Sequence, residues 1–400
     1  MVSIVADDGD VERCLERILA LSRRGGAVFS DDMTIRCRAG DFAIEAPVRR
    51  AGEVLARLPR DRLVPIMPFR FSIESDDLRI AAMDPGQPRE RVELMEAMLA
   101  LYNLAGKMAR HRRTSPWSLV AAHPQILPAI EPRLAGADLR MLAALARSGN
   151  GHDLMLNSFL LTRVYGDRAS DAQAPALVLM PVIDALNHHI GGQPYVNETV
   201  GGRDYLSIRR SGPLPGAGAE CFACYGPLDG FDSWTTYGFV DEAVPFMRSM
   251  AMTIDLPEAG RIVVDGARRP PVPGTVPAAL TDIRFHVPRI LARRPREITV
   301  SSLLIPGPGA PAALRRVLGH LVAELRPERR GGADLVVRAE AQIVSANRSF
   351  YVELRRSLQA LALRVSAQRP IRDAFAGLCD RQLGHLERHE RRVRDMPGTG

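Results

Sequence analysis

The spacing of hydrophobic residues changes its period several times along the chain. Between residues 11 and 26 apolar residues return every three or four positions and a Gly-Gly pair follows, which predicts an amphipathic helix that ends at the glycines. From about residue 28 to 80 short apolar runs alternate with turn residues, which predicts a series of β-strands. Residues 88–165 return to helical spacing and predict a helical insertion.

The second half of the chain repeats this change from strand-like to helix-like sequence. Strand-like runs occur at residues 176–183, 204–210 and 220–226. A linker-like stretch rich in proline and glycine follows at 267–277, and at least three helical segments come after residue 245. This order predicts an α+β protein in which a strand-rich domain precedes a mainly α-helical C-terminal domain. An α/β fold would need regular βαβ spacing, which the sequence does not show.

Length and composition set the scale of this organisation. The chain has 400 residues, of which 46% are hydrophobic and 25% charged, and such a chain is expected to form two or three globular domains. We expect a helix within residues 1–27, the strand-rich domain at 28–245 with its insertion at about 88–165, and the helical domain at 246–400.

Charge is distributed unevenly between the two ends of the chain. Residues 251–400 carry 25 arginines against 15 acidic residues, whereas residues 1–250 carry 28 basic against 31 acidic residues. The C-terminal arginines are scattered and form no stripe with aromatic residues, so we expect no nucleic-acid partner. Charge alone favours an acidic or extended protein partner for this region. All basic residues except Lys107 are arginines, which is typical of a GC-rich genome.

The cysteines and histidines do not form a metal-binding pattern. Cys221 and Cys224 are three residues apart, but no second pair of cysteines or histidines stands at a matching spacing, so we expect no metal site. His188 and His189 are adjacent, and their side chains are expected to diverge. The odd number of cysteines, the charged N-terminus and the lack of a long apolar run predict a cytoplasmic protein without a membrane segment. We expect a monomer.

Residues 307–312 imitate the glycine-rich loop that binds dinucleotides. The sequence Gly-Pro-Gly-Ala-Pro-Ala follows a strand-like run. Pro308 and Pro311 lack the N–H groups that such a loop uses to bind phosphate. A loop followed by a helix start is therefore the favoured interpretation. The alternative, a nucleotide-binding oxidoreductase, predicts NAD(P) binding that is lost when Gly307 is changed.

The most informative stretch lies between residues 177 and 242. It contains four short motifs, which are Pro181-x-x-Asp184-x-x-Asn187-His188, Gly218-Ala219-Glu220, Tyr225-Gly226 and Tyr237-Gly238-Phe239. Each motif alone fits ordinary structure, because Asp often forms turns and Gly often ends helices. Their order and spacing together are more specific.

These motifs resemble those of the SET-domain methyltransferases, in particular the branch that contains the Rubisco large-subunit lysine methyltransferase and the actin histidine methyltransferase. Residues 51–65 look like the family's Gly-Glu strand, residues 115–124 like the Ser-x-Trp segment of its helical insertion, and residues 157–167 like the segment that carries Ser-Arg-x-Phe. The resemblance covers roughly residues 30–250. It continues loosely into the C-terminal region, where the family carries a substrate-docking domain.

The resemblance implies methyl transfer from S-adenosylmethionine to a protein nitrogen, with lysine as the first acceptor to consider. It implies that Gly40 lies in the first cofactor loop and that Arg163 pairs with the cofactor carboxylate. It also implies that Asp184 orients the Asn-His loop, and that Asn187 and His188 hold the adenine.

The resemblance also assigns several tyrosines. Tyr237 corresponds to the catalytic tyrosine of the family and Tyr225 to a second tyrosine at the substrate channel. Tyr165 matches an aromatic residue of the channel. Tyr195 and Tyr205 both lie near the position of a further channel tyrosine, and the sequence does not choose between them.

The chain departs from the family pattern in its first loop. Phe42 stands where the family has a second glycine, and His189 and Thr162 each replace a serine. The Phe42 departure motivates an alternative hypothesis, a non-catalytic SET-like binding module. Within the enzyme class, a histidine or a small-molecule amine is the alternative acceptor.

Overall fold

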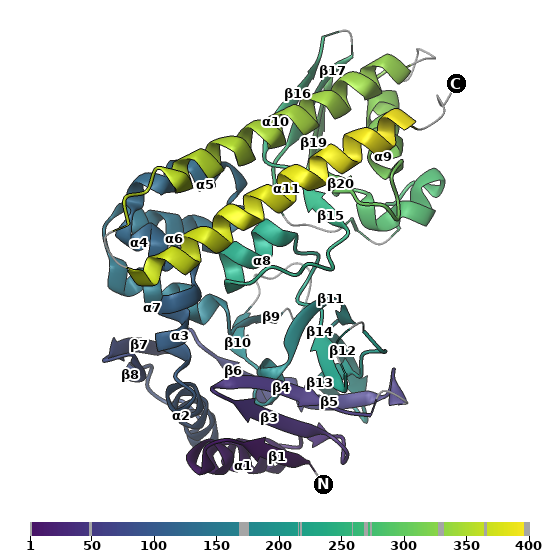
Figure 1. The fold of residues 1–400 in the computed structure, drawn as a ribbon. Coiled ribbons are helices and arrows are strands. Elements are labelled where there is room, and N and C mark those ends of the chain that lie inside the picture. Colours follow the sequence, from purple (N-terminus) through teal and green to yellow (C-terminus); the bar gives the residue numbers. More distant parts are fainter. Residues whose placement is uncertain are drawn as a thin grey trace. The chain divides into compact units, whose positions relative to one another are not determined.

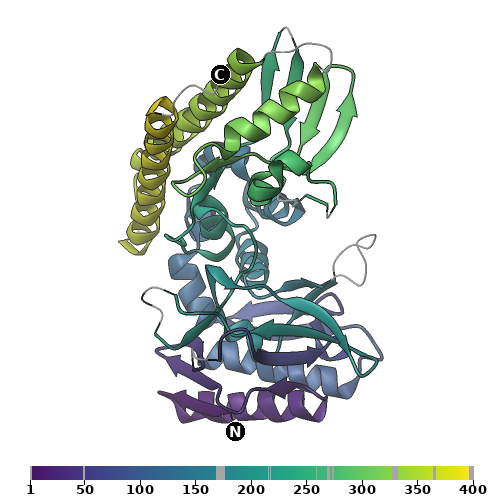
Figure 2. The same ribbon diagram turned by 90° about the vertical axis from the view of Figure 1, so that its right-hand side faces the viewer.

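The computed structural model describes residues 2–47, 50–167, 176–214, 216, 218–257, 259–267, 271–272, 274–326, 332–363 and 366–395. The chain forms two compact units, each built from separate segments. The first unit comprises Met1–Thr114 and His152–Leu228, and the second comprises Ser115–Gly151 and Asp229–Gly400. Each unit contains both helices and sheets, so the fold class is α+β (Figures 1 and 2).

The first unit holds three sheets and a hairpin. One sheet has the order β1 (Ser3–Ala6), β3 (Thr34–Arg38), β4 (Asp41–Glu45), β14 (Glu220–Ala223) and β11 (Asn187–Gln193). A second has the order β12 (Val196–Val200), β13 (Arg203–Arg209), β5 (Val54–Pro59) and β2 (Val28–Phe29). The third has the order β6 (Val64–Pro65), β10 (Ala176–Leu179) and β9 (Tyr165–Asp167), and the hairpin joins β7 (Phe69–Glu74) to β8 (Asp77–Met83).

Helix α1 (Gly9–Arg24) confirms the amphipathic helix that the sequence predicts. The side chain of Asp8 caps its first turn by accepting a hydrogen bond from the Asp10 N–H, and Gly25 follows its last residue. Its buried residues are three or four positions apart, and this face packs against α2 (Arg89–Leu104). Figure 1 shows the two helices side by side. Strand β1 precedes the helix and pairs in parallel with β3, a pairing that the local pattern does not reveal.

Two further helices of the first unit come from the predicted helical insertion. They are α3 (Lys107–Thr114) and α7 (Gly151–Leu161). The middle part of the insertion belongs to the second unit, where it forms α4 (Pro116–Ala122), α5 (Leu127–Ile130) and α6 (Ala137–Arg147).

The second unit joins these helices to a sheet and to the C-terminal helices. The sheet has the order β16 (Met252–Leu256), β17 (Gly260–Val264), β19 (Glu297–Val300) and β18 (Ile290–Arg294), and β15 (Phe246–Arg248) pairs with β20 (Leu304–Pro306). The helices are α8 (Gly230–Tyr237), α9 (Ala313–Leu325), α10 (Ala333–Gln359) and α11 (Arg369–Asp395).

The C-terminal region therefore contains more strand than the sequence predicts. Its three long helices agree with the predicted helical segments, and α10 and α11 run side by side (Figure 2). The four strands of the sheet are only four or five residues long, and the predicted linker lies partly outside the described residues. None of the helices within the described ranges combines the length and the hydrophobicity that crossing a membrane requires.

Candidate functional site

Three of the predicted motif segments meet in the five-stranded sheet of the first unit. Strand β11 begins at Asn187 and runs parallel to β14, which pairs with β4. The Asn187 side-chain amide donates hydrogen bonds to the Phe42 carbonyl (3.0 Å) and to a carboxylate oxygen of Glu220 (2.7 Å). One side chain thus ties together residues that are more than 140 positions apart in the sequence.

The turn that leads into Asp184 has an unusual backbone. Val182 has φ 69° and ψ −54°, and the Ile183 N–H donates to the Pro181 carbonyl at 2.8 Å, which makes a tight three-residue turn. Such a conformation costs a β-branched residue about 1–3 kcal/mol and persists where the surroundings enforce it. This strained residue lies directly before Asp184, in the segment that carries the predicted Asp-x-x-Asn-His motif.

Asp184 lies among aromatic and cationic side chains of the first unit. The Tyr102 hydroxyl donates a hydrogen bond to its carboxylate. Burial raises the pKa of Asp184, while Tyr102, Arg163 and Lys107 act in the opposite direction. Burial and the Asp184 charge together raise the pKa of Tyr102 well above its ordinary value, so Tyr102 is a hydrogen-bond donor and not a base.

Arg163 lies near this carboxylate, and its side chain makes no hydrogen bond within the described residues. Its guanidinium carbon is 5.6 Å from the ring centre of Tyr102 and 5.5 Å from that of Phe159. Its Nε atom is buried and has no partner among the described residues. Arg62, Arg133 and Arg210 also have a buried Nε without a hydrogen-bond partner there, but those three guanidinium groups form ion pairs with carboxylates, whereas the Arg163 guanidinium stacks on aromatic rings.

Lys107 belongs to the same group of side chains, although sequence reasoning assigned it no role. It is 7% exposed, and its Nζ is 4.5 Å from the centre of the Phe42 ring. Burial, and after it the charge of Arg163, lowers the pKa of Lys107 to about 7. The signal available in the sequence was its uniqueness, since every other basic residue is an arginine.

His188 and Tyr225 hold the parallel strands β11 and β14 together at one end. The Tyr225 N–H donates to His188 Nδ1 at 3.0 Å, and the two rings lie 5.1 Å apart. The Tyr225 hydroxyl donates to the Leu186 carbonyl. His189 points elsewhere, since its Nδ1 accepts from the Gly191 N–H at 2.9 Å. The two adjacent histidines therefore diverge, as the sequence predicts.

The structure separates the candidate channel tyrosines. The rings of Tyr165 and Tyr195 meet edge to face at 5.5 Å, and the Tyr195 hydroxyl donates to the Ile183 carbonyl at 3.3 Å. Tyr205 lies on β13, where its ring faces the Arg203 guanidinium at 5.9 Å. Tyr195 is therefore the tyrosine that lies next to Tyr165 and to the Asp184 turn.

Gly40 has a structural explanation that needs no ligand. It has φ 78°, and a Cβ at this position would lie 2.2 Å from the backbone oxygen of Ala105. The loop between β3 and β4 thus requires glycine because it approaches the end of α2. Phe42 follows on β4, and its side chain is buried.

Tyr237 belongs to the second unit, at the end of α8. Gly238 follows with φ 78° and donates its N–H to the Trp234 carbonyl at 2.9 Å, a glycine cap that confirms the predicted helix end. The rings of Tyr237 and Phe239 lie 5.8 Å apart. Trp117, from the Ser-x-Trp segment on α4, donates from its indole to the Thr235 carbonyl at 2.8 Å and anchors the same helix.

A buried ionic network fixes the other end of α8. Asp229 is fully buried and caps the helix by accepting from the Asp232 N–H at 2.9 Å. Its other oxygen accepts from the Arg248 N–H at 2.8 Å and from Arg133. The Arg248 guanidinium binds Asp232. Two buried arginines are thus matched by two buried aspartates, which is the condition for tolerating such charges in a core.

The weaker sequence signals have structural explanations. Within the described ranges no group of three or more His, Cys, Asp and Glu side chains could hold a metal ion. Cys221 is a buried free cysteine opposite Ile44. A Cβ on Gly307 would lie 2.4 Å from the Pro245 carbonyl oxygen, so this glycine serves backbone packing.

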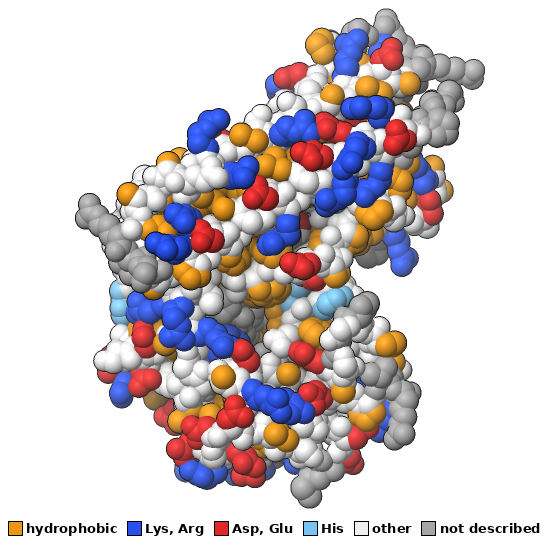
Figure 3. All heavy atoms as spheres, in the orientation of Figure 1, with side chains coloured by type: hydrophobic (Ala, Val, Ile, Leu, Met, Phe, Trp, Pro, Cys, Tyr) orange, Lys and Arg blue, Asp and Glu red, His pale blue; other side chains and the backbone are white. Residues whose placement is uncertain are grey.

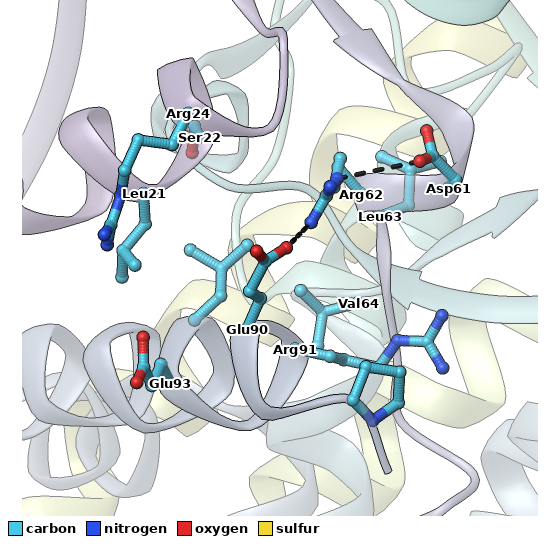
Figure 4. Close-up of a pocket in the computed structure, with 12 residues that line it drawn as sticks. Leu21, Ser22, Arg24, Asp61, Arg62, Leu63, Val64, Glu90, Arg91 and Glu93 are labelled. Atoms are coloured by element: carbon cyan, nitrogen blue, oxygen red, sulfur yellow. Dashed lines mark hydrogen bonds and ion pairs between the residues drawn. The ribbon is translucent and has the colours of Figure 1, made fainter.

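A separate pocket of about 310 Å³ lies between α1, α2 and residues 61–64 (Figure 4). Figure 4 shows Arg62 between Asp61 and Glu90, both of which pair with its guanidinium. None of the residues predicted to act in the site lines this pocket.

No protein-family model matches the chain, and no curated protein matches it. Among solved structures, the SET domain of LSMT bound to lysine and AdoHcy is 14% identical with a TM-score of 0.39. Rubisco LSMT bound to sinefungin and monomethyllysine is 13% identical with a TM-score of 0.38, and Rubisco LSMT bound to AdoMet is 12% identical with a TM-score of 0.35. Each comparison covers 97% of both chains. Identities and scores this low do not assign the chain to that family.

Proposed function

We propose that this chain is an S-adenosylmethionine-dependent protein N-methyltransferase that acts on lysine. The observation that carries the proposal is the meeting of the motif segments in one sheet. Asn187 binds the Phe42 carbonyl and Glu220, and His188 binds the Tyr225 backbone. Motifs that are ordinary one by one thus form a single hydrogen-bonded assembly in the first unit.

The residues around Asp184 fit the amino-acid end of such a cofactor. The Arg163 guanidinium faces two aromatic rings and has a buried Nε without a partner among the described residues. A carboxylate is the planar acceptor that guanidinium groups bind best. We assign Arg163 to the cofactor carboxylate, and Asn187 and His188 to the adenine, with Asp184 orienting their loop.

When bound, the cofactor supplies a methyl carbon already activated by its sulfonium sulfur. The protein has to position the acceptor and keep it neutral, because a lysine amine with its ordinary pKa of about 10.4 is protonated at neutral pH. An apolar aromatic channel disfavours the ammonium form by desolvation. We assign Tyr165 and Tyr195 to this channel, since their rings are in contact.

Two tyrosines are assigned to orienting the neutral amine. Tyr hydroxyls and backbone carbonyls carry partial negative charge, which stabilises the positive charge that develops on the transferred methyl group. The motif order gives this role to Tyr237, with Tyr225 as a second contributor. The role of Tyr237 is assigned from the resemblance alone. Helix α8, which ends at Tyr237, is held by the Asp229 cap and by the hydrogen bond from Trp117.

The protein substrate is proposed to dock on the C-terminal region. The arginines of α10 and α11 are interspersed with acidic residues over the face seen in Figure 3, and some pair across the two helices, as Arg348 does with Glu390 and Arg355 with Asp380 (3.0 Å). Such pairs reduce the local field, so an acidic partner would have to compete with them. By the excess of arginine in this region alone, we propose an acidic or extended protein partner.

A second candidate function is a non-catalytic binding module. Phe42 favours it, since its buried side chain occupies a strand where the family has a glycine. Calorimetry with S-adenosylhomocysteine separates the two candidates, because a chain that shows no heat at high ligand concentration cannot be the enzyme.

The proposed function is tested by labelling. The purified chain is incubated with isotope-labelled S-adenosylmethionine and a lysate from a strain that lacks the protein, and labelled bands are identified by mass spectrometry. We expect label on lysine of a small number of proteins. Label on histidine or on a small amine would show that lysine is not the acceptor, while methyl transfer from S-adenosylmethionine would still hold. No label on any acceptor, together with no heat in the calorimetry, would favour the binding module.

A further inference from the structure

Two cations share one partly buried region of the first unit. Lys107 lies over the Phe42 ring and Arg163 over the Tyr102 and Phe159 rings. They are close enough for the charge of Arg163 to act on Lys107, and both act on Asp184. Stacking on aromatic rings holds each cation in place without using its N–H groups.

Neither cation makes a hydrogen bond within the part of the chain that the structure describes. Lys107 Nζ, with three donors, lies over the Phe42 ring and makes no hydrogen bond within the described residues, and the Arg163 Nε is buried and unpaired there. A residue that is 7% exposed would normally be paired or neutral. The buried Arg163 Nε therefore indicates an acceptor outside the described residues, and the Lys107 ammonium beside it is available to the same acceptor.

The charges indicate the kind of acceptor. When Lys107 is protonated, it and Arg163 contribute two positive charges, and the ionised Asp184 contributes one negative charge and accepts a hydrogen bond from the Tyr102 hydroxyl. One positive charge remains unmatched among these side chains. A monoanionic group completes the balance, whereas a dianion would exceed it.

We propose that Lys107 is a second binding residue for the carboxylate of the methyl donor. Lys107 and Arg163 bind this carboxylate together, and the face of the Phe42 ring contacts the Lys107 ammonium. This inference rests on the proposed function, since it names how one end of that cofactor is recognised. It also explains Phe42, because a glycine at this position would leave the ammonium without its aromatic support.

The test compares ligands that differ at the carboxylate. Binding of S-adenosylhomocysteine, decarboxylated S-adenosylmethionine and 5′-methylthioadenosine is measured by calorimetry for the wild-type chain, Lys107→Met and Lys107→Arg. Arg113→Met is the matched control, because Arg113 is an exposed cation on the same helix. Circular dichroism verifies that each variant is folded.

We expect Lys107→Met to weaken S-adenosylhomocysteine binding at least about tenfold, the effect of losing one hydrogen bond to a charged group. Binding of the two ligands without a carboxylate should change by less than about twofold, and Lys107→Arg should retain part of the affinity. Equal losses for all three ligands, or none, would overturn the assignment of Lys107 while leaving the methyltransferase proposal intact.

A measurement on the wild-type chain makes the test independent of the variants. Because Lys107 is the only lysine, ¹³C labelling of lysine side chains gives a single Cε resonance. This resonance should shift with S-adenosylhomocysteine and remain in place with 5′-methylthioadenosine. The same response to both ligands would contradict the inference. A wild-type chain that binds none of the three ligands would overturn both the inference and the proposed function.

Discussion

Replacing Lys107 by methionine should stabilise the folded protein at pH 6 and have progressively less effect as the pH rises. In the unfolded chain this amine keeps its proton up to its ordinary pKa of 10.5, whereas in the folded protein burial lowers that pKa to about 7. Below pH 7 both states are protonated, so the folded state bears the full cost of a buried charge. Between pH 7 and 10.5 the unfolded state binds more protons, and stability rises with pH.

The size of this effect follows from the two pKa values. Each pH unit between them corresponds to about 1.4 kcal/mol, so the pH-dependent part amounts to about 4–5 kcal/mol. Methionine has a similar length and no charge, so the variant avoids this cost. The contact between the ammonium and the Phe42 ring is already part of this pKa and is not counted again. The expected gain for the variant at pH 6 is therefore about 4–5 kcal/mol.

The assay is urea unfolding followed by far-ultraviolet circular dichroism at several pH values from 6 to 9.5. Tryptophan fluorescence would not serve, because both tryptophans, Trp117 and Trp234, belong to the second unit. Lys107→Arg is the control, since arginine stays charged over this whole range. The free-energy difference between the arginine and methionine variants should therefore be independent of pH.

Two results would refute this reasoning. One is a free-energy difference between the wild-type chain and Lys107→Met that does not change from pH 6 to 9.5. The other is a titration of the single lysine resonance with a midpoint near 10, as for an exposed amine. Agreement with the expectation, combined with weaker cofactor binding by the same variant, would show that the buried lysine is kept for binding at the expense of stability.

Three further predictions concern other parts of the molecule. Tyr237→Phe should reduce the rate of methylation by at least about a hundredfold while S-adenosylhomocysteine binding persists. The control is Tyr205→Phe, which changes a tyrosine beside an arginine and should stay near wild-type activity. Equal rates for both variants would remove Tyr237 from the mechanism. Asp229→Ala should lower the free energy of unfolding by about 3–5 kcal/mol because it leaves buried arginine unpaired, and a loss below about 1 kcal/mol in tryptophan-monitored unfolding would contradict this. Gly40→Ala should lower the melting temperature clearly more than Gly86→Ala, because Gly86 has a similar positive φ but open space where a Cβ would lie. Equal shifts of the melting temperature would rule out the backbone clash at Gly40.

Features that depend on neighbouring residues could be read directly from the sequence. The ends of α1 and α8 follow from an aspartate before the first turn and a glycine after the last. The α+β class follows from the change of hydrophobic period along the chain. The order of the Asp-x-x-Asn-His and tyrosine motifs located the segments that Asn187 and His188 join.

Features that depend on distant residues could not be read in this way. Strand β1 exists because β3 lies beside it, and Gly40 is required by a carbonyl at the end of α2. Tyr195 and not Tyr205 lies beside the Tyr165 ring, and nothing in their local sequence distinguishes the two tyrosines.

The sequence by itself determined the helix ends, the fold class and the motif segments, because caps and hydrophobic periodicity act over a few residues. It also marked Lys107 as unique, but not as buried. Only the tertiary structure decided that Lys107 lies over Phe42 and close to Arg163 and Asp184. The physical reason is that desolvation and charge interactions depend on distance in space and not on distance along the chain.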